Sequence, residues 1–407
     1  MLLPSCLFAT SNHINMLENY INQYRDNLLD DVIPFWMKHS LDREQGGFFT
    51  CLDAHGKVYD TDKFIWLQGR QVWTFSMLYN RLGQRQEWLD VALHGADFLL
   101  KNGRAADGSW YFSTTREGKP LIQPYNIFSD CFATMAFSQL SQATQNQQYA
   151  DIAKTTFDQI LNRRNNPKGK WSKAVAETRP LKNFALPMIL CNLSLEIEHL
   201  LDASLVNQTI YECIHEVMEV FYDQNSGLIV ENVTPEGNLS DSFEGRLLNP
   251  GHAIEAMWFI MDLAVRLNDK NLIEKAVKIT LDTLEYSWDQ EFGGIYYFLD
   301  LKGAPPQQLE WNQKLWWVHV ETLIALLKGF QHTQNPVCWK WFERIHNYTW
   351  SHFPDPVNGE WYGYLDRKGE ILLPLKGGKW KGCYHIPRAL YQCWQTLEAL
   401  VIPTQSS

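Results

Sequence analysis

The stretch Gln45-Gly46-Gly47-Phe48-Phe49, a glycine turn followed by aromatic residues, carries the pattern from which the fold is predicted. Five further turns combine glycine with an aromatic or β-branched residue in the same way. They are Asp107-Gly108-Ser109-Trp110-Tyr111, Lys168-Gly169-Lys170-Trp171, Ser226-Gly227-Leu228-Ile229, Phe292-Gly293-Gly294-Ile295-Tyr296 and Asn358-Gly359-Glu360-Trp361-Tyr362. Successive copies are 61, 61, 58, 66 and 66 residues apart, so one structural unit is repeated six times.

Each unit has room for two helices after its turn, because apolar residues recur there at helical spacing, as Val72, Phe75 and Leu78 do in the first unit. We expect first helices near residues 66–82, 127–143, 183–200, 249–267, 314–331 and 382–400. Second helices are expected near 85–101, 147–163, 205–223, 269–288 and 336–351. One more helix, near 14–39, precedes the first turn.

This N-terminal helix has no partner unless it pairs with the last helix of the chain. That pairing closes twelve helices into an all-α (α/α)6 barrel of six helical hairpins, with short β-hairpin-like loops at one mouth. An open solenoid of hairpins is the alternative, since it also buries each unit against its neighbours. The count of six and the unpaired helix favour closure. No linker rich in Pro, Gly or Ser divides the chain, so we expect a single domain over residues 1–407, with short flexible tails near 1–13 and 402–407.

The composition of the 407-residue chain limits its partners. Thirty-six basic against 46 acidic side chains give a net charge of -10, which disfavours nucleic acid. No stretch reaches the roughly 18 uninterrupted apolar residues that span a bilayer, and no secretory signal is recognisable. The eight cysteines form no C-x-x-C pair and no cluster with histidine at metal spacing. We therefore predict a cytoplasmic protein with reduced thiols, no metal centre, and no membrane or nucleic-acid partner.

Polar side chains at the starts of the predicted first helices mark the candidate site. In a closed ring these helices lie inside, and their N-terminal ends gather at one mouth. His252 and His385 stand at equivalent places in the fourth and sixth units, and a charged residue follows each at i+3 on the same helical face. These charged residues are Glu255 and Arg388. Arg70 begins the first inner helix, where a guanidinium can polarise a carbonyl or hold a hydroxyl.

Aromatic residues and histidines at this mouth favour a sugar substrate and proton transfer. Trp316, Trp317 and Trp380 are candidate stacking surfaces for a sugar ring, although ordinary helix packing explains each of them about as well. His319, taken alone, is more simply a hydrogen-bonded core histidine. Glycoside hydrolysis typically uses two carboxylates, whereas histidine both accepts and donates protons near neutral pH. The pair of histidines therefore predicts an epimerase or isomerase.

Four segments, in this order and over nearly the whole chain, resemble the N-acylglucosamine 2-epimerase family, also called renin-binding protein. They are Gly46-Gly47-Phe48-Phe49, Trp66-Leu67-Gln68-Gly69-Arg70, Asn249-Pro250-Gly251-His252-Ala253-Ile254-Glu255 and Tyr384-His385-Ile386-Pro387-Arg388. The resemblance implies an (α/α)6 barrel, commonly a homodimer, that interconverts N-acetylglucosamine and N-acetylmannosamine. It also implies that ATP is an activator that is not consumed.

The family pattern further implies roles for individual residues. His252 and His385 match the two bases that remove the C2 proton of the open-chain sugar and return a proton to the opposite face of an enediolate. Arg70 matches an arginine near O1, where it stabilises the developing oxyanion. Glu255, Glu321 and Arg388 match family residues that orient the histidines or hold hydroxyls of the sugar. Glu255 also matches a residue that assists ring opening.

The third predicted inner helix bears on the choice of substrate. Relatives that act on cellobiose or mannose carry a further histidine there, whereas this sequence reads Asn183-Phe184-Ala185-Leu186-Pro187-Met188. An apolar lining suits an N-acetyl group better than a second sugar. The residues expected to bind the substrate are therefore Glu321, Arg388, Trp316, Trp380, Asn183 and Met188. An aldose–ketose isomerase, a cellobiose 2-epimerase and a non-enzymatic binding protein are the alternatives, and the intact histidine set argues against the last.

The basic run from Arg163 to Lys173 is the candidate nucleotide site. It contains Gly169-Lys170 but lacks the full Gly-x-x-x-x-Gly-Lys-[Ser/Thr] pattern that cradles phosphates. A solvated turn is therefore the competing interpretation. If ATP binds here as an allosteric activator, its phosphates are expected to meet Lys168, Lys170 and Lys173.

Overall fold

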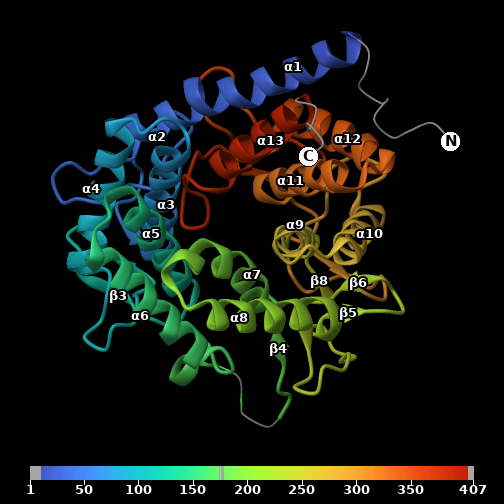
Figure 1. Cartoon of the computed structure of the whole chain (residues 1–407), viewed down its shortest axis with the longest axis horizontal. Helices are drawn as coiled ribbons and strands as arrows, with labels where there is room; N and C mark the ends of the chain where they lie inside the picture. Colours follow the sequence, from blue (N-terminus) through green and yellow to red (C-terminus); the bar gives the residue numbers. More distant parts are fainter. Residues whose placement is uncertain (1–10, 174, 176–177, 402–407) are drawn as a thin grey trace.

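The computed structural model describes residues 11–173, 175 and 178–401, and its helices form a ring of six pairs (Figure 1). The inner helices are α3 (Ile65–Arg81), α5 (Phe128–Thr144), α7 (Ala185–Ile197), α9 (Pro250–Leu267), α11 (Trp316–Thr333) and α13 (His385–Val401). Their outer partners are α4 (Gln86–Asn102), α6 (Gln147–Arg163), α8 (Ala203–His215), α10 (Lys270–Ser287), α12 (Pro336–His352) and α1 (Ser11–Asp26). The predicted (α/α)6 barrel is confirmed.

Burial distinguishes the inner from the outer helices. In α3 every residue from Leu67 to Leu78 is buried, because the helix is surrounded by other helices. In α4 the buried residues recur at helical spacing, as Trp88, Ala92 and Leu99 do, and leave one face to solvent. One hydrophobic cluster runs through the described chain from Leu17 to Leu397.

The N-terminal helical run closes the ring. α1 continues through a π-helical segment, η2 (Asn27–Val32), into α2 (Ile33–His39). α1 packs against α13 and buries Leu17, Ile21 and Tyr24. The chain just before α13 is tied to α3, because the Thr74 hydroxyl donates to the carbonyl of Cys383 at 2.7 Å. The helix without a partner in sequence therefore pairs with the last helix, as predicted.

Helix boundaries differ from the expected ones where another element takes over. The helix expected over 183–200 begins later, at Ala185 of α7, because residues 182–183 form a strand. At its other end, α7 is followed by a 3-10 turn, η4 (Glu198–Leu200). The helix expected over 205–223 is α8 followed by a π-helical segment, η5 (Glu216–Val220). Of the expected tails, residues 1–10 and 402–407 lie outside the described residues, and Ser11 already belongs to α1.

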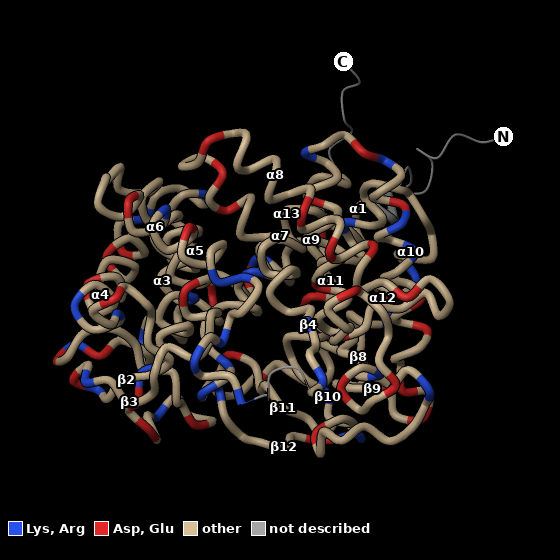
Figure 2. Tube along the Cα trace, turned by 90° about the horizontal axis from the view of Figure 1, so that it is seen from below, with Lys and Arg blue, Asp and Glu red and all other residues tan. Residues whose placement is uncertain are grey.

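Short antiparallel strands gather at one end of the ring (Figure 2). In four hairpins the strand before the inner helix pairs with the segment after the outer helix. These pairs are β1 (Lys63–Phe64) with β2 (Ser113–Thr114), β4 (Lys182–Asn183) with β7 (Asn232–Val233), β8 (Leu247–Leu248) with β9 (Leu299–Asp300), and β10 (Lys314–Leu315) with β11 (Tyr364–Leu365). The remaining strands are β3 (Pro120–Ile122) on β2, β12 (Ile371–Leu373) on β11, and β5 (Tyr222–Asp223) paired with β6 (Leu228–Ile229). The starts of α3, α7, α9 and α11 are thereby fixed at this mouth.

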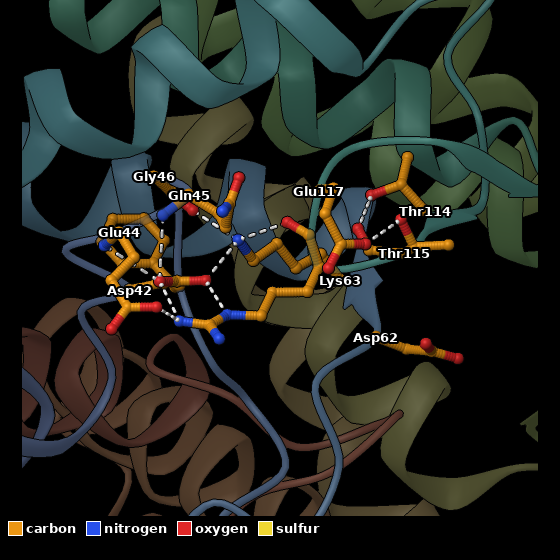
Figure 3. Close-up of polar contacts among 12 residues, drawn as sticks. Asp42, Glu44, Gln45, Gly46, Asp62, Lys63, Thr114, Thr115 and Glu117 are labelled. Carbon is orange, nitrogen blue, oxygen red and sulfur yellow. Dashed lines mark hydrogen bonds and ion pairs between the residues drawn. The ribbon is translucent and has the colours of Figure 1, made fainter.

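A buried lysine clamps the start of α3. Lys63 Nζ lies 2.9 Å from the Asp42 carboxylate and donates to the carbonyl of Arg116 at 3.0 Å (Figure 3). The Arg116 guanidinium adds a second cation at 2.9 Å. Burial alone would raise the pKa of Asp42, but these two cations hold it well below its ordinary value. The same arrangement precedes α11 and consists of Lys314, Asp289 and Arg367.

Side chains pack closely against Gly47 in the glycine turn of the first unit. The substitution Gly47→Ala tests how much this packing contributes to stability. Gly47 has φ +70°, and an added Cβ would lie 2.7 Å from Gln68 Oε1 and 2.8 Å from Phe98 Cγ. Gln68 holds this turn through two hydrogen bonds of 2.8 Å to the backbone of Phe48. Strain and overpacking together are expected to lower the free energy of unfolding by about 2–4 kcal/mol in urea titrations.

The matched control is Gly83→Ala. Gly83 has φ +96°, and an added Cβ would meet no atom within 4 Å. Backbone strain alone is therefore expected, with a loss of about 1 kcal/mol. Equal losses in the two variants would contradict the packing explanation for Gly47.

Two further expectations concern thiols and membranes. The described cysteines, Cys51 to Cys393, are all buried and free of disulfides. Within the described ranges, no helix has both the length and the apolar character that a bilayer crossing requires.

Candidate active site

Charged side chains from four inner helices meet inside the mouth. Arg70 comes from α3, His252 and Glu255 from α9, Glu321 from α11, and His385 and Arg388 from α13. Less than a tenth of each residue is exposed, apart from His252, whose side chain is 26% exposed. The structure therefore brings together the four predicted catalytic residues and two of the predicted substrate-binding residues.

Arg388 lies at the centre of this cluster. Its Nη2 pairs with Glu321 Oε1 at 2.7 Å and also with the Glu255 carboxylate. Its Nη1 donates to the Tyr384 hydroxyl at 2.7 Å. One guanidinium thus offsets two buried carboxylates, which a low-dielectric site would otherwise disfavour.

His385 is oriented by Glu321. The Nδ1 atom of His385 lies 2.7 Å from Glu321 Oε1, and an ionised carboxylate only accepts hydrogen bonds. Nδ1 therefore carries the hydrogen, which leaves Nε2 as the basic nitrogen. Burial and the positive charge of Arg70 lower the pKa of His385 well below its ordinary value. A neutral imidazole of this kind can accept a proton.

His252 is held by Glu231, a residue that no sequence motif indicated. Its Nδ1 lies 3.0 and 3.2 Å from the two carboxylate oxygens of Glu231, which is 6% exposed. Burial on its own would lower the pKa of His252, but the charge and hydrogen bond of Glu231 raise it above its ordinary value. The expected partner at i+3, Glu255, pairs with Arg388 instead.

Glu231 could not be found from helical spacing, because it lies on the connection between β6 and β7. Its backbone N–H donates to the carbonyl of Leu247, and its carbonyl accepts from Phe184, both at 2.9 Å. These bonds tie the connection to β8, which precedes α9, and to the residue that caps the start of α7. An acidic residue directly after the apolar run Leu228-Ile229-Val230 was the one available signal.

Arg70 is enclosed by aromatic rings. Its guanidinium carbon lies 4.3 Å from the ring centre of Trp66, 4.0 Å from Phe132 and 4.7 Å from Tyr384. Burial lowers its pKa to about 10, so it remains charged at neutral pH. Its Nε atom has no hydrogen-bond partner in the described part of the chain. A buried cation with a free donor is suited to an oxyanion.

Of the three tryptophans predicted to stack on the sugar, two lie next to the histidines and one is more exposed. The ring centre of Trp317 lies 5.4 Å from the ring centre of His252 and 5.8 Å from that of His385, so both histidines contact the same indole. Trp316 lies 6.3 Å from His385. Its indole N–H is buried without a partner among the described residues. Trp380 is 48% exposed and lies farther out.

Other predicted residues are placed differently. Asn183 is exposed on β4, where its amide bonds Asn232 at 3.0 Å and its oxygen accepts from the N–H of Ala185 at 3.1 Å. Met188 is buried in the hydrophobic core. The exposed side chains near the 3-10 turn η3 (Gly169–Trp171) include Lys168, Lys170 and Lys173. Within residues 11–173, 175 and 178–401, no hydrogen bond or ring contact joins Asn183 or these lysines to His252 or His385.

His319 is a core histidine, as its sequence context predicted. Its Nδ1 donates to the carbonyl of Leu315 at 2.7 Å, and its Nε2 accepts from the backbone of Ile295 at 3.1 Å. Burial lowers its pKa to about 3, so it stays neutral. Both ring nitrogens are occupied by the backbone, so neither is available to a ligand.

Among the described residues, one set has spacing suited to a metal ion. Glu255, Glu321 and His385 each bring a ligand atom within 4.8 Å of the others. Arg388 already pairs with both carboxylates, and its guanidinium supplies the positive charge that a metal would bring. The charge balance therefore favours ion pairs with the Arg388 guanidinium, rather than a metal ion, at these carboxylates.

Comparison with known proteins adds to this geometry. The model of the N-acylglucosamine 2-epimerase (GlcNAc 2-epimerase) family matches residues 47–389. N-acylglucosamine 2-epimerase of Mus musculus is 40% identical over 384 residues, covering 92% of this chain and 91% of that protein. Cellobiose 2-epimerase of Bacteroides fragilis is 24% identical, covering 89% and 95%. The structure of cellobiose 2-epimerase from Bacillus thermoamylovorans superposes with a TM-score of 0.81 at 22% identity, covering 93% and 99%.

Proposed function

Because the chain belongs to the N-acylglucosamine 2-epimerase family, we propose that it interconverts N-acetylglucosamine and N-acetylmannosamine by two-base proton transfer at C2. The chain is a carbohydrate isomerase, and its reaction is the reversible 2-epimerisation of an N-acylglucosamine. One observation carries the mechanism. His252 and His385 contact the same indole, and a carboxylate holds the Nδ1 of each, so that each has Nε2 as its basic nitrogen.

The mechanism starts from the open-chain sugar. The C1 aldehyde makes the C2 proton acidic, and one histidine removes it through Nε2. The electron pair of the C–H bond moves toward O1, which becomes the oxygen of an enolate. The other histidine delivers a proton to the opposite face of C2, and the configuration inverts.

Arg70 stabilises the enolate in this scheme. Its charge is buried among three aromatic rings, where the low dielectric strengthens its interaction with a developing O1 anion. Glu255 and Glu321 are both bound to Arg388 and keep the two-histidine site rigid. Trp316 and Trp317 offer stacking faces to the sugar. The indole N–H of Trp316 has no partner among the described residues and is a donor for a hydroxyl or the acyl oxygen.

Deuterium labelling tests the function. N-acetylmannosamine is incubated with the protein in D2O, and C2 is followed by NMR. We expect N-acetylglucosamine that carries deuterium at C2. Formation of fructose from mannose, without epimerisation of the N-acetyl sugar, would favour the aldose–ketose isomerase instead.

ATP activation is proposed for the basic loop near η3. The donor set fits a polyphosphate, since Lys168, Lys170 and Lys173 are exposed and Trp171 offers an aromatic face beside Lys170. We expect the triple variant with alanine at the three lysines to need roughly tenfold more ATP for half-maximal stimulation. The control replaces three other exposed lysines, Lys101, Lys119 and Lys270, by alanine. An unchanged ATP requirement in the first variant would exclude this loop.

A homodimer and a cytoplasmic location complete the proposal. The free thiols of the described cysteines suit a reducing compartment. Light scattering coupled to gel filtration tests the dimer, and a single monomer mass over the working concentration range would contradict it.

A further inference from the structure

The two histidines of the site have carboxylate partners of different kinds. The Glu321 carboxylate accepts hydrogen bonds from Arg388 at 2.7 Å, from Trp258 at 2.9 Å and from His385. The Glu231 carboxylate bonds the His252 ring, and no other side chain in the described part of the chain bonds it. One carboxylate is therefore already neutralised by a guanidinium, and the other is not.

This difference decides which imidazole can hold a second proton. An imidazolium gains most from a carboxylate whose charge is otherwise uncompensated and which it contacts directly. Glu231 meets that condition at His252, with both oxygens within 3.2 Å of Nδ1. Glu321 does not meet it at His385, because Arg388 shares the same oxygen, Glu321 Oε1.

The charged groups around His252 support the same assignment. His252 faces Glu231 from the β6–β7 connection, Glu255 from its own helix, Trp317 from α11 and His385 from α13. Glu231 raises the pKa of His252 against the effect of burial. The His252 side chain is 26% exposed, which allows proton exchange with water.

His385 has more cations near it. The charged and titratable groups that face it are Arg70, Arg388, Glu255, Glu321, His252 and Tyr384. Burial and Arg70 lower its pKa, and Arg388 and His252 act in the same sense. The negative charge of Glu255 opposes them without reversing the result.

We propose that Glu231 is a positioning residue that keeps His252 as the proton donor of the resting enzyme and leaves His385 as its first base. This rests on the proposed two-base function. For the epimer whose C2–H faces His385, His385 Nε2 takes the proton and the C–H electron pair becomes the enolate. His252 Nε2 then gives its proton to the opposite face of C2. The enzyme is left with the charge on His385, and proton exchange with water restores the resting state.

The pH dependence of kcat/KM tests Glu231. Glu231→Gln keeps the shape and a hydrogen-bond acceptor but removes the charge that holds the His252 proton. We expect the alkaline limb of the profile to move to lower pH, with roughly tenfold lower kcat/KM on that limb. Glu231→Asp retains the charge and is expected to recover most of the wild-type profile.

Glu236→Gln is the matched control, since Glu236 is exposed and lies five residues farther along the chain, just after β7. It removes the same charge from the protein and is expected to leave the profile unchanged. An alkaline limb that stays in place in Glu231→Gln, or that moves equally in Glu236→Gln, would overturn the proposal.

A titration that needs no turnover separates this proposal from the proposed function. In protein labelled with 15N-histidine, and assigned with His252→Asn and His385→Asn, the His252 ring should lose its second proton at higher pH than the His385 ring. The reverse order would reject the role of Glu231, even if the wild type epimerises and even if Glu231→Gln fails to fold. A wild type that incorporates no deuterium at C2 would reject the function while leaving this titration order measurable.

Discussion

His252→Asn and His385→Asn are each expected to lower kcat for epimerisation by about 10²–10⁴-fold, because each removes a general acid–base group from a two-base reaction. Asparagine can still hydrogen-bond to Glu231 or Glu321, so both variants are expected to fold. The measurement is the initial rate of N-acetylglucosamine formation from N-acetylmannosamine. Thermal unfolding followed by circular dichroism checks that the fold is retained.

Solvent exchange in D2O makes this prediction sharper. A variant that keeps one histidine can still remove and return a proton on the face of C2 that this histidine reaches. His252→Asn is therefore expected to exchange the C2 proton of one epimer without inversion, and His385→Asn that of the other epimer. His55→Asn is the control, since His55 is exposed and bonds Asn358 outside the cluster. Near-native turnover in either catalytic variant, or exchange of both epimers by one variant, would contradict the two-base scheme.

Arg388→Met is expected to cost about 3–5 kcal/mol of unfolding free energy at neutral pH, because it leaves two buried carboxylates without their cation. The residue is 2% exposed, so water cannot replace the guanidinium. Burial already raises the pKa of Glu321, with Arg388 opposing this effect. Without Arg388 the folded-state pKa of Glu321 should rise further above that of the unfolded chain.

The sign of the pH dependence follows from this change. A carboxyl group whose folded-state pKa is raised destabilises the fold when it is ionised, and this penalty falls as the pH drops through the raised value. The stability gap between Arg388→Met and the wild type should therefore narrow from pH 7 toward pH 5 in urea titrations. A gap independent of pH would show that lost packing, rather than unpaired charge, causes the destabilisation.

A double variant and a surface control complete this experiment. Glu255→Gln combined with Arg388→Met removes one of the stranded charges and should recover part of the stability lost in Arg388→Met. Arg344→Met replaces an exposed arginine that lies over the rings of Trp288 and Trp341. Its expected cost is about 0.5–1 kcal/mol. A similar cost for both arginines would mean that the buried pairs contribute little.

The sequence predicted the ring well, because the glycine turns recur at a nearly constant interval. It also located His252 and His385, since both lie at the starts of inner helices where a polar residue needs a partner or a role. It failed where the partner comes from a different hairpin. Glu231 reaches His252 from the connection that follows α8, and no periodicity within α9 points to it.

The buried ion pairs at the mouth were not predicted, although the sequence carries a signal for them. Lys63 and Arg116 both recur 251 residues later in the chain, as Lys314 and Arg367. Charged residues repeated at one offset indicate that two units of the ring share the same clamp. The position of Asn183 on a strand was harder to predict. β4 is only two residues long, and the same residues are also compatible with the start of a helix.

The pairing of α1 with α13 has a consequence for how the protein is made. α1 is synthesised before the other helices of the ring, yet Leu17, Ile21 and Tyr24 lie on a helix that packs against α13, the last helix of the ring. The nascent chain therefore remains an open arc, with the apolar face of α1 uncovered, until α13 has been synthesised. Contacts between such distant parts of a chain form slowly. We therefore expect the uncovered face of α1 to be prone to aggregation until the ring closes.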